Sequence, residues 1–165
     1  MAGKNKNQNK KKKGTTSSLI ASNKRAYHDY HVEEQYTAGI ELQGTEVKSL
    51  RAREATMTES FCKVVNGEAQ LYGLYIKPYD HGTHYNHDPH RVRKLLLNKL
   101  EIKKIHDKMT QKGYSLIPLR LFFSRCWVKV ELGLCKGKKI HDKRADMAKK
   151  DQQRDMARIQ KMFNR

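Results

Sequence analysis

The sequence lacks the paired cysteines that build disulfide-linked or zinc-linked domains. It has three cysteines, and Cys62, Cys126 and Cys135 are too far apart for a zinc knuckle or a redox motif. Cys126 shares the parity of Val128 and Val130, which favours a buried structural thiol. These features fit a reducing compartment, so we expect a cytoplasmic protein.

Long apolar segments are also missing. The longest apolar runs, such as Leu95 to Leu97, fall far short of the roughly 20 residues that span a bilayer. No apolar stretch follows the lysine-rich N-terminus, as a secretory signal would require. We therefore expect no membrane partner.

Acidic residues are scarce relative to basic ones. The 165 residues include 35 Lys and Arg but only 17 Asp and Glu, which gives a formal net charge of +18. Solubility does not require so large an excess, which instead favours a polyanionic partner such as RNA or DNA. The length allows one domain with a modest core.

The groups of a catalytic site are not arranged in a recognisable pattern. There is no Gly-x-Ser-x-Gly, no glycine-rich phosphate loop and no cysteine with an evident base. Four histidines recur every third residue, but Pro89 and the neighbouring Gly and Asn disfavour the helix that would align them on zinc. The four are His81, His84, His87 and His90. We expect no enzyme, cofactor or metal; a metal hydrolase built on these histidines is the alternative from another class.

Alternating apolar residues predict a mainly β fold. Strands are expected at 30–42, 45–50, 60–65, 69–76, 114–123 and 126–134. Asn66-Gly67 is typical of a two-residue hairpin, and a second turn is expected at Ser124-Arg125. We therefore predict an OB-like closed antiparallel barrel of about six strands.

Two helices should accompany this barrel. Asn98 and Glu101 form the capping box of one main inserted helix that ends at Gly113, and a short N-terminal helix begins near Asn23. The barrel is expected over residues 19–135. Residues 1–18 are a lysine-rich segment expected to be disordered, and residues 136–165 form a flexible basic tail that becomes helical when bound.

Four segments mix cations with polar or aromatic side chains, as RNA recognition requires. They span residues 23–30, 44–51, 88–98 and 136–146. Each one alone could be a solvated surface, but together they favour RNA. A protein that binds ribosomal RNA permanently, as a ribosomal or assembly component, is the alternative among RNA-binding proteins.

With these segments in view, the chain resembles the SsrA-binding protein family, the bacterial partner of transfer-messenger RNA in ribosome rescue. The resemblance rests on residues 23–26 (Asn-Lys-Arg-Ala), 42–51, 93–98 (Arg-Lys-Leu-Leu-Leu-Asn), 136–139 and 141–144 (His-Asp-Lys-Arg). It implies a monomeric barrel without chemistry of its own that binds the tRNA-like domain of transfer-messenger RNA. The tail would enter the small-subunit decoding centre and the empty mRNA channel of a stalled ribosome.

The resemblance also implies which residues make contacts. On the barrel, the RNA contacts would be Asn23, Lys24, Arg25, Glu46, Lys48, Arg51, Arg93, Lys94, Leu96 and Asn98. In the tail, the ribosome contacts would be Gly137, Lys138, Lys139, His141, Asp142, Lys143, Arg144, Arg154, Arg158, Ile159, Lys161 and Met162. Thr37 stands where many relatives carry a glutamate, so no acidic contact is expected there.

Overall fold

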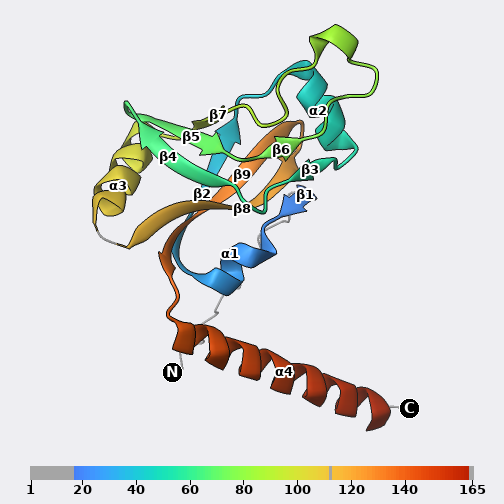
Figure 1. The fold of residues 1–165 in the computed structure, drawn as a ribbon, viewed down its shortest axis with the longest axis vertical. Helices are drawn as coiled ribbons and strands as arrows, with labels where there is room; N and C mark the ends of the chain where they lie inside the picture. The colour runs from blue at the N-terminus through green and yellow to red at the C-terminus, as the bar shows by residue number, and fades with distance from the viewer. Residues whose placement is uncertain (1–16, 112, 164–165) are drawn as a thin grey trace, which may run out of the picture.

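The computed structural model describes residues 17–111 and 113–163, and its main body is a ring of antiparallel strands (Figure 1). The strands pair in the order β8-β4-β5-β7-β2-β9, and β9 pairs again with β8. Their bounds are β2 Tyr30–Ile40, β4 Phe61–Val65, β5 Glu68–Tyr72, β7 Arg93–Leu96, β8 Tyr114–Ser124 and β9 Trp127–Gly137. The mainly β, OB-like prediction is confirmed.

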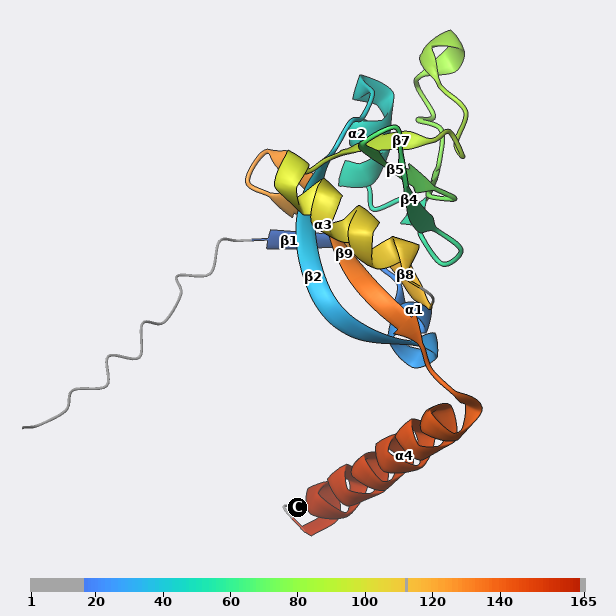
Figure 2. The same cartoon turned by 90° about the vertical axis from the view of Figure 1, so that its left-hand side faces the viewer.

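Further elements surround the ring. They are β1 Ser17–Ser22, β3 Ala55–Thr56, β6 Tyr75–Ile76, a 3₁₀ turn at Thr83–Tyr85, α1 Lys24–Asp29, α2 Gly44–Arg51, α3 Lys99–Thr110 and α4 Ile140–Phe163. Figures 1 and 2 show α1 at the end of the barrel nearest α4 and α2 at the opposite end. Helix α4 projects away from the barrel in both views.

Neighbouring strands of the ring do not all pair over the same length. Strands β8 and β9 pair along almost their full lengths, as do β2 and β9. In contrast, β4 meets β8 through a single residue pair, Cys62 with Leu116. This narrow seam leaves an opening between β4 and β8.

Apolar residues fill the inside of the ring and a smaller space outside it. The inner core includes Leu71, Leu116 and Leu132, which are at most 1% exposed. A second cluster forms where α1 covers the outer surface of β8 and β9, and its members are Ala26, Ile117, Leu119 and Cys135. Burying each large aliphatic side chain contributes about 1.5–3 kcal/mol, which fixes the barrel and seats α1 on it.

The prediction of a strand at residues 45–50 is wrong, because α2 occupies this segment. Its buried residues Glu46, Ser49 and Leu50 are spaced as one face of a helix. Gln43 and Glu46 form a capping box that starts the helix. Gln is not a typical N-cap residue, so the sequence gives no clear capping signal, and alternation in so short a segment favours a strand.

Two other local predictions need correction. The expected strand 69–76 is split into β5 and β6 at Gly73, whose φ of +70° turns the chain. Cys126 is exposed rather than buried, because the β8–β9 turn is Arg125-Cys126 instead of Ser124-Arg125. The thiols of Cys62 and Cys135 are the buried ones, and burial raises the pKa of each, that of Cys135 to about 11.

The ends of the barrel differ slightly from the expected boundaries. Strand β1 already includes Ser17 and Ser18, and β9 continues to Gly137. Residues 1–16, most of the segment expected to be disordered, lie outside the described residues. In the structure Ile140–Phe163 of the tail form helix α4, and the dependence of this helix on binding stays a prediction. No helix in the described part of the chain is long and apolar enough to cross a membrane.

Candidate nucleic-acid interface

Helix α1 carries the first group of expected contacts. Asn23 caps this helix: its side-chain oxygen accepts a hydrogen bond from the backbone N–H of Ala26 at 3.1 Å, and only 4% of the residue is exposed. Lys24 and Arg25 are exposed, and Arg25 is ion-paired with Asp29, one turn later in the helix, at 3.3 Å. The two cations can therefore meet a phosphate, while Asn23 holds the helix start.

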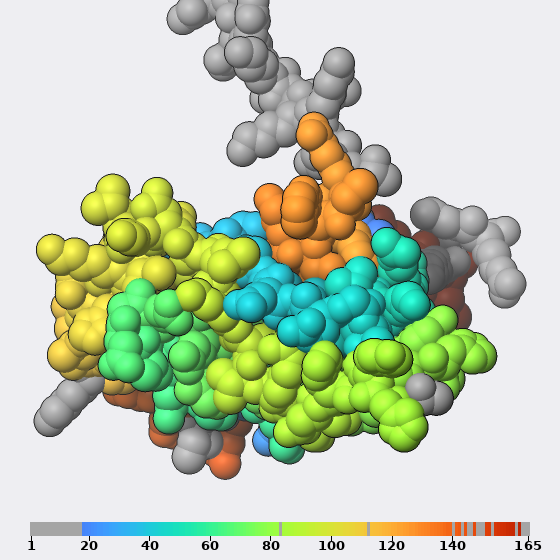
Figure 3. All heavy atoms as spheres, turned by 90° about the horizontal axis from the view of Figure 1, so that it is seen from above, coloured from blue at the N-terminus to red at the C-terminus, as the bar shows by residue number. Residues whose placement is uncertain are grey.

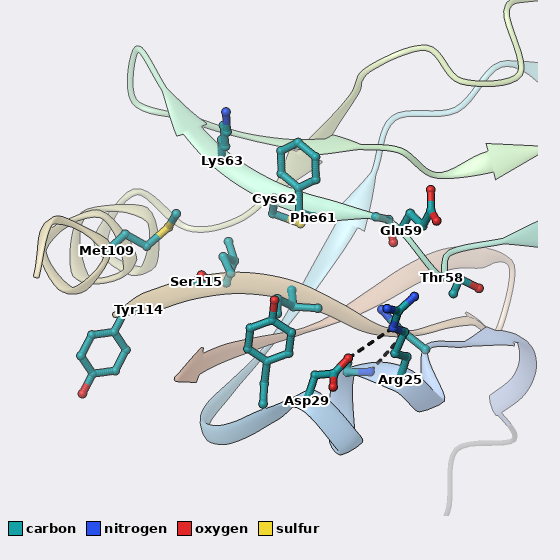
Figure 4. Close-up of a pocket in the computed structure, with 16 residues that line it drawn as sticks. Arg25, Asp29, Thr58, Glu59, Phe61, Cys62, Lys63, Met109, Tyr114 and Ser115 are labelled. Atoms are coloured by element: carbon teal, nitrogen blue, oxygen red, sulfur yellow. Dashed lines mark hydrogen bonds and ion pairs between the residues drawn. The ribbon is translucent and has the colours of Figure 1, made fainter. Parts of the chain in front are cut away.

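Arg25 also borders a pocket of about 480 Å³ at the β4–β8 seam. Figure 4 shows Arg25 and Asp29 on α1 at one side of this pocket and Phe61 and Lys63 on β4 at the other. The ring of Phe61 is stacked on Tyr72 with centroids 5.3 Å apart. Both charge signs and aromatic rings line the pocket, so it offers a mixed polar surface rather than a buried ligand cavity.

A buried ion-pair cluster connects α2 to the start of β7 and the residues just before it. The carboxylate of Glu46, at the start of α2, is ion-paired with Arg91 at 2.6 Å and with Arg93 at 2.8 Å. It also accepts a hydrogen bond from the backbone N–H of Gln43 at 2.7 Å. Burial raises the pKa of Glu46, but the hydrogen bonds from Arg91 and Gln43 and the charge of Arg93 lower it more, so the net shift is downward. Glu46 is therefore an anionic anchor inside a basic surface.

Arg93 is enclosed completely and has no exposed surface. Its guanidinium donates to Glu46 and to the backbone oxygens of Leu74, Arg91 and Pro89, at 2.6–3.1 Å. Its position gives Arg93 internal partners and leaves no surface for a direct RNA contact. Glu46 is 6% exposed, and its carboxylate is engaged by Arg91, Arg93 and the backbone of Gln43. Both residues can serve RNA binding by fixing the shape of this end of the barrel.

The accessible cations of this end lie on α2. Lys48 and Arg51 are accessible to solvent, and the Lys48 ammonium lies over the ring of Tyr79 at 4.9 Å from its centroid. Figure 3 looks onto this end of the molecule. Helix α2, strand β7 and the loop that follows β6 form one continuous surface there. A pocket of about 400 Å³ lies between α2 and that loop.

The last expected barrel contacts follow β7. Lys94 is exposed and ion-paired with Glu68, and Leu96 is 56% exposed. Asn98 caps α3 by accepting the N–H of Leu100 at 3.2 Å, as predicted, and remains exposed. Lys94, Leu96 and Asn98 are thus all accessible to a partner.

Thr37 lies exposed on β2, with Glu131 of β9 as its neighbour across the strands. Glu131 is 8% exposed and its carboxylate is ion-paired with Arg120. The acid beside this position is therefore neutralised within the barrel.

The tail begins at a fixed point on α1. The backbone N–H of Lys138 donates to the carbonyl of Asp29 at 3.0 Å, and its ammonium donates to the carbonyl of Tyr27 at 3.0 Å. A lysine at the last carbonyls of a helix also suits the negative end of the helix dipole. Gly137 pairs with Tyr30 as the last residue of β9. The root of the tail is therefore bound to the same helix that carries Lys24 and Arg25.

Beyond this root the tail residues are accessible. Lys139, His141, Asp142 and Arg144 are exposed, and Asp142 accepts the N–H of Lys139 at 3.3 Å. Farther along α4, Arg154 and Arg158 form loose ion pairs with acids one turn earlier, at 3.5 and 3.7 Å, and Ile159 and Met162 are 50% and 79% exposed. The side chains of Lys143 and Lys161 lie outside the described part of the structure.

The histidine loop does not form a metal centre among the described residues, where no group of three or more His, Cys, Asp or Glu side chains could hold an ion. Two of the histidines contact tyrosine rings instead: His81 lies against Tyr79 and His90 against Tyr75, with centroids 5.4 and 5.1 Å apart. These contacts make the loop a polar and aromatic surface next to α2.

Several residues of this interface were missed by the sequence analysis. Arg91 completes the ion-pair cluster, Tyr79 supports Lys48, and Trp127 is 74% exposed at the β8–β9 turn. Arg91 lies within one of the basic segments, but nothing in the sequence pairs it with Glu46, 45 positions away. The whole arrangement presents two sets of cations on a rigid barrel, which suits docking to a folded polyanion.

Comparisons with known proteins agree on one family. The family model described as SmpB protein matches residues 20–162. The SsrA-binding protein of Geobacter metallireducens is 57% identical over 139 residues, covering 84% of this chain and 91% of that protein. The SsrA-binding protein of Geotalea uraniireducens is 56% identical over 147 residues, covering 89% and 97%.

A solved structure gives the same result. It is described as "tmRNA-SmpB: a journey to the center of the bacterial ribosome", and it matches with a TM-score of 0.62 and 50% identity over 73% of this chain and 85% of that chain. The family model covers most of the chain, and the relatives share more than half of their aligned residues with it. The chain therefore belongs to the SmpB protein family.

Proposed function

We propose that this protein is an RNA-binding adaptor of ribosome rescue. Its barrel holds the tRNA-like domain of transfer-messenger RNA and brings it to stalled ribosomes. The observation that carries this proposal is the 50% identity to an SmpB chain solved with transfer-messenger RNA and the ribosome. The formal charge of +18 and the exposed cations on α1 and α2 support a polyanionic partner.

The barrel and the tail have separate tasks in this proposal. Helices α1 and α2 on the barrel place Lys24, Arg25, Lys48 and Arg51 for contacts with a folded RNA, and no chemical step is assigned to these residues. Helix α4 enters the decoding centre and the mRNA channel. Because mRNA and the cationic tail would compete for the same polyanionic walls, the tail fits only where mRNA is missing.

Gly137 to Lys139 form the junction between the two tasks. The contacts of Lys138 with the carbonyls of Tyr27 and Asp29 support a tail whose root has a defined direction. His141 is exposed three residues beyond Lys138 and is the group that we assign to stacking on ribosomal RNA.

A chain that ends at Lys139 tests this division, because it keeps all of β9 and the contacts of Lys138. We expect it to bind transfer-messenger RNA as tightly as the full chain and to abolish tagging of stalled peptides in a reconstituted translation system. A full-length variant with His141→Ala and Arg144→Ala should lose tagging in the same way. Equal loss of RNA binding and tagging in the shortened chain would refute the separation of tasks.

A further inference from the structure

The strand register creates a continuous row of residues on the outside of the barrel. Leu96 of β7 lies beside Gly39 of β2, which lies beside Lys129 of β9. The row continues to Phe122 of β8 and Leu19 of β1. Leu96 and Leu19, at its two ends, are 56% and 48% exposed. The row therefore connects Leu96 with residues of β9, β8 and β1 that are not among the expected RNA contacts.

Trp127 extends this surface at the tip of the β8–β9 hairpin. Alternate residues of a strand share a face, so Trp127 points to the same side as Lys129. Trp127 pairs with Ser124, which pairs in turn with Ser17, so β1 supports the hairpin next to the indole. Figure 3 shows the hairpin, in orange, projecting beside the end of β2 and the segment that follows it.

The exposure of Trp127 is unusual, because the large apolar surface of an indole is generally buried in a folded protein. It is 74% exposed, although the neighbouring Val128 and Val130 on the other face are buried. The Arg125-Cys126 turn, with Arg125 at φ 57°, places the indole outside the barrel. A side chain held outside in this way is available to a partner.

The charges around Trp127 identify the kind of partner. Arg125 is exposed and Lys129 is half-buried, and in the described part of the chain neither is engaged by an ion pair. The acid that follows on the same face of β9, Glu131, is already paired with Arg120. Free cations beside an open aromatic face are the combination that binds unpaired nucleotides.

We propose that Trp127 stacks on an unpaired base of the RNA that the barrel holds, while Arg125 and Lys129 contact the adjacent phosphates. This inference rests on the proposed function and adds a recognition element to it. A continuous duplex would offer only its backbone to this hairpin, so the RNA must present a base whose face is open. Leu96 lies at the β7 end of the row, whereas Trp127 lies on the β8–β9 hairpin. The contact therefore extends the RNA-binding face across β2 to β9 and β8.

Trp127 is the one tryptophan of the chain, so indole fluorescence reports on this position alone. Titration of the full-length protein with the tRNA-like domain of transfer-messenger RNA should quench the emission at the concentrations that saturate binding in a filter assay. Trp127→Ala should weaken binding about 5- to 150-fold, the effect of losing one stacked base. Trp127→Phe should lose less, because a smaller ring still stacks.

Salt dependence separates stacking from charge. Trp127→Ala should leave the slope of log affinity against log salt unchanged, whereas Lys129→Gln should reduce its magnitude by about 0.7–0.9. Met156→Ala is the matched control: this side chain is also exposed and apolar, at 69%, but it lies on α4 and its loss should not change binding to the isolated RNA. Thermal unfolding of each variant checks that the fold is kept, and Trp127→Phe carries the test if the alanine variant does not fold.

The outcomes distinguish this inference from the function on which it rests. Unchanged emission at saturation, with unchanged affinity of both Trp127 variants, overturns the stacking contact and leaves the adaptor function intact. Emission that changes only when ribosomal subunits are added also overturns it, because the partner is then the ribosome. Wild-type affinity no better than for an unrelated structured RNA would instead overturn the proposed function.

Discussion

Replacing Glu46 by glutamine removes the single negative charge that two arginines share. The glutamine side chain would still fill the N3 position of the capping box, because both Glu and Gln serve there. The change therefore isolates the charge from the cap. Arg91 would keep a route to solvent, as it is 24% exposed, but Arg93 has none.

The size of the effect follows from this burial. Removing one partner of a buried pair costs about 3–5 kcal/mol, because the remaining charge stays desolvated. Glutamine retains an oxygen that can accept a hydrogen bond, so we expect the lower end, about 3 kcal/mol. That is a large part of the roughly 5–15 kcal/mol that typically stabilises a folded domain. The midpoint of thermal unfolding should fall by roughly 10 °C.

Chemical denaturation of Glu46→Gln measures this loss directly, and Glu54→Gln is the matched control. Glu54 is also ion-paired, in its case with Lys77 at 3.0 Å, but both side chains are about a third exposed or more. Such a surface pair contributes at most about 1 kcal/mol. Equal losses in the two variants would show that Arg93 does not depend on Glu46.

The pH dependence of the same experiment has a defined sign. The folded-state pKa of Glu46 is lower than its usual value, so its stabilising effect is complete above the unfolded value of about 4.3. As the pH falls below that value toward the folded-state pKa, the effect disappears. The difference in stability between wild type and Glu46→Gln should therefore be constant near neutral pH and shrink only in acid. A difference that grew in acid would contradict the assignment.

Two further predictions concern β2 and the turn after β5. Hydrogen bonds from Lys108, a tyrosine and a second lysine hold the pKa of Glu34 at about 2. In acid denaturation, the stability difference between wild type and Glu34→Gln should therefore be constant above about pH 4.3. It should disappear as the pH falls toward about 2. A difference that persisted at the lowest pH would mean that Glu34 acts by packing rather than by charge. Gly73→Ala should cost more than Gly67→Ala in urea denaturation, by about 1 kcal/mol or more. Both glycines have positive φ, +70° and +75°, but a Cβ at Gly73 would lie 2.9 Å from the backbone oxygen of Glu59, whereas Gly67 has open space; equal costs would refute the steric explanation.

Most strands could be predicted from local patterns because each has a side that faces the core. The alternation of Val128, Val130, Leu132 and Leu134 is one example, and the capping box at Asn98 shows that a helix start can be equally local. Local patterns failed where tertiary contacts decide. Nothing near Ser17 in the sequence indicates that it pairs with Ser124, which lies far along the chain.

The candidate site could be predicted only at the level of residue types. The basic segments indicated RNA, and the family resemblance supplied individual residues. Neither could separate surface cations such as Lys48 from the enclosed Arg93, because both occur in basic segments. Burial depends on which carboxylate and which carbonyls the fold brings nearby. Here those groups come from α2, from Leu74 in the turn after β5 and from Pro89 just before β7.

The helical form of the tail makes its far end sensitive to the length of its near end. With 24 residues and a rise of about 1.5 Å per residue, α4 is a rod of roughly 36 Å. One inserted residue near Ile140 would turn everything beyond it by about 100°, while about seven would add about 10 Å and almost restore the original direction. The direction in which Ile159 and Met162 project from α4 is thus set about 30 Å away, where Lys138 binds α1.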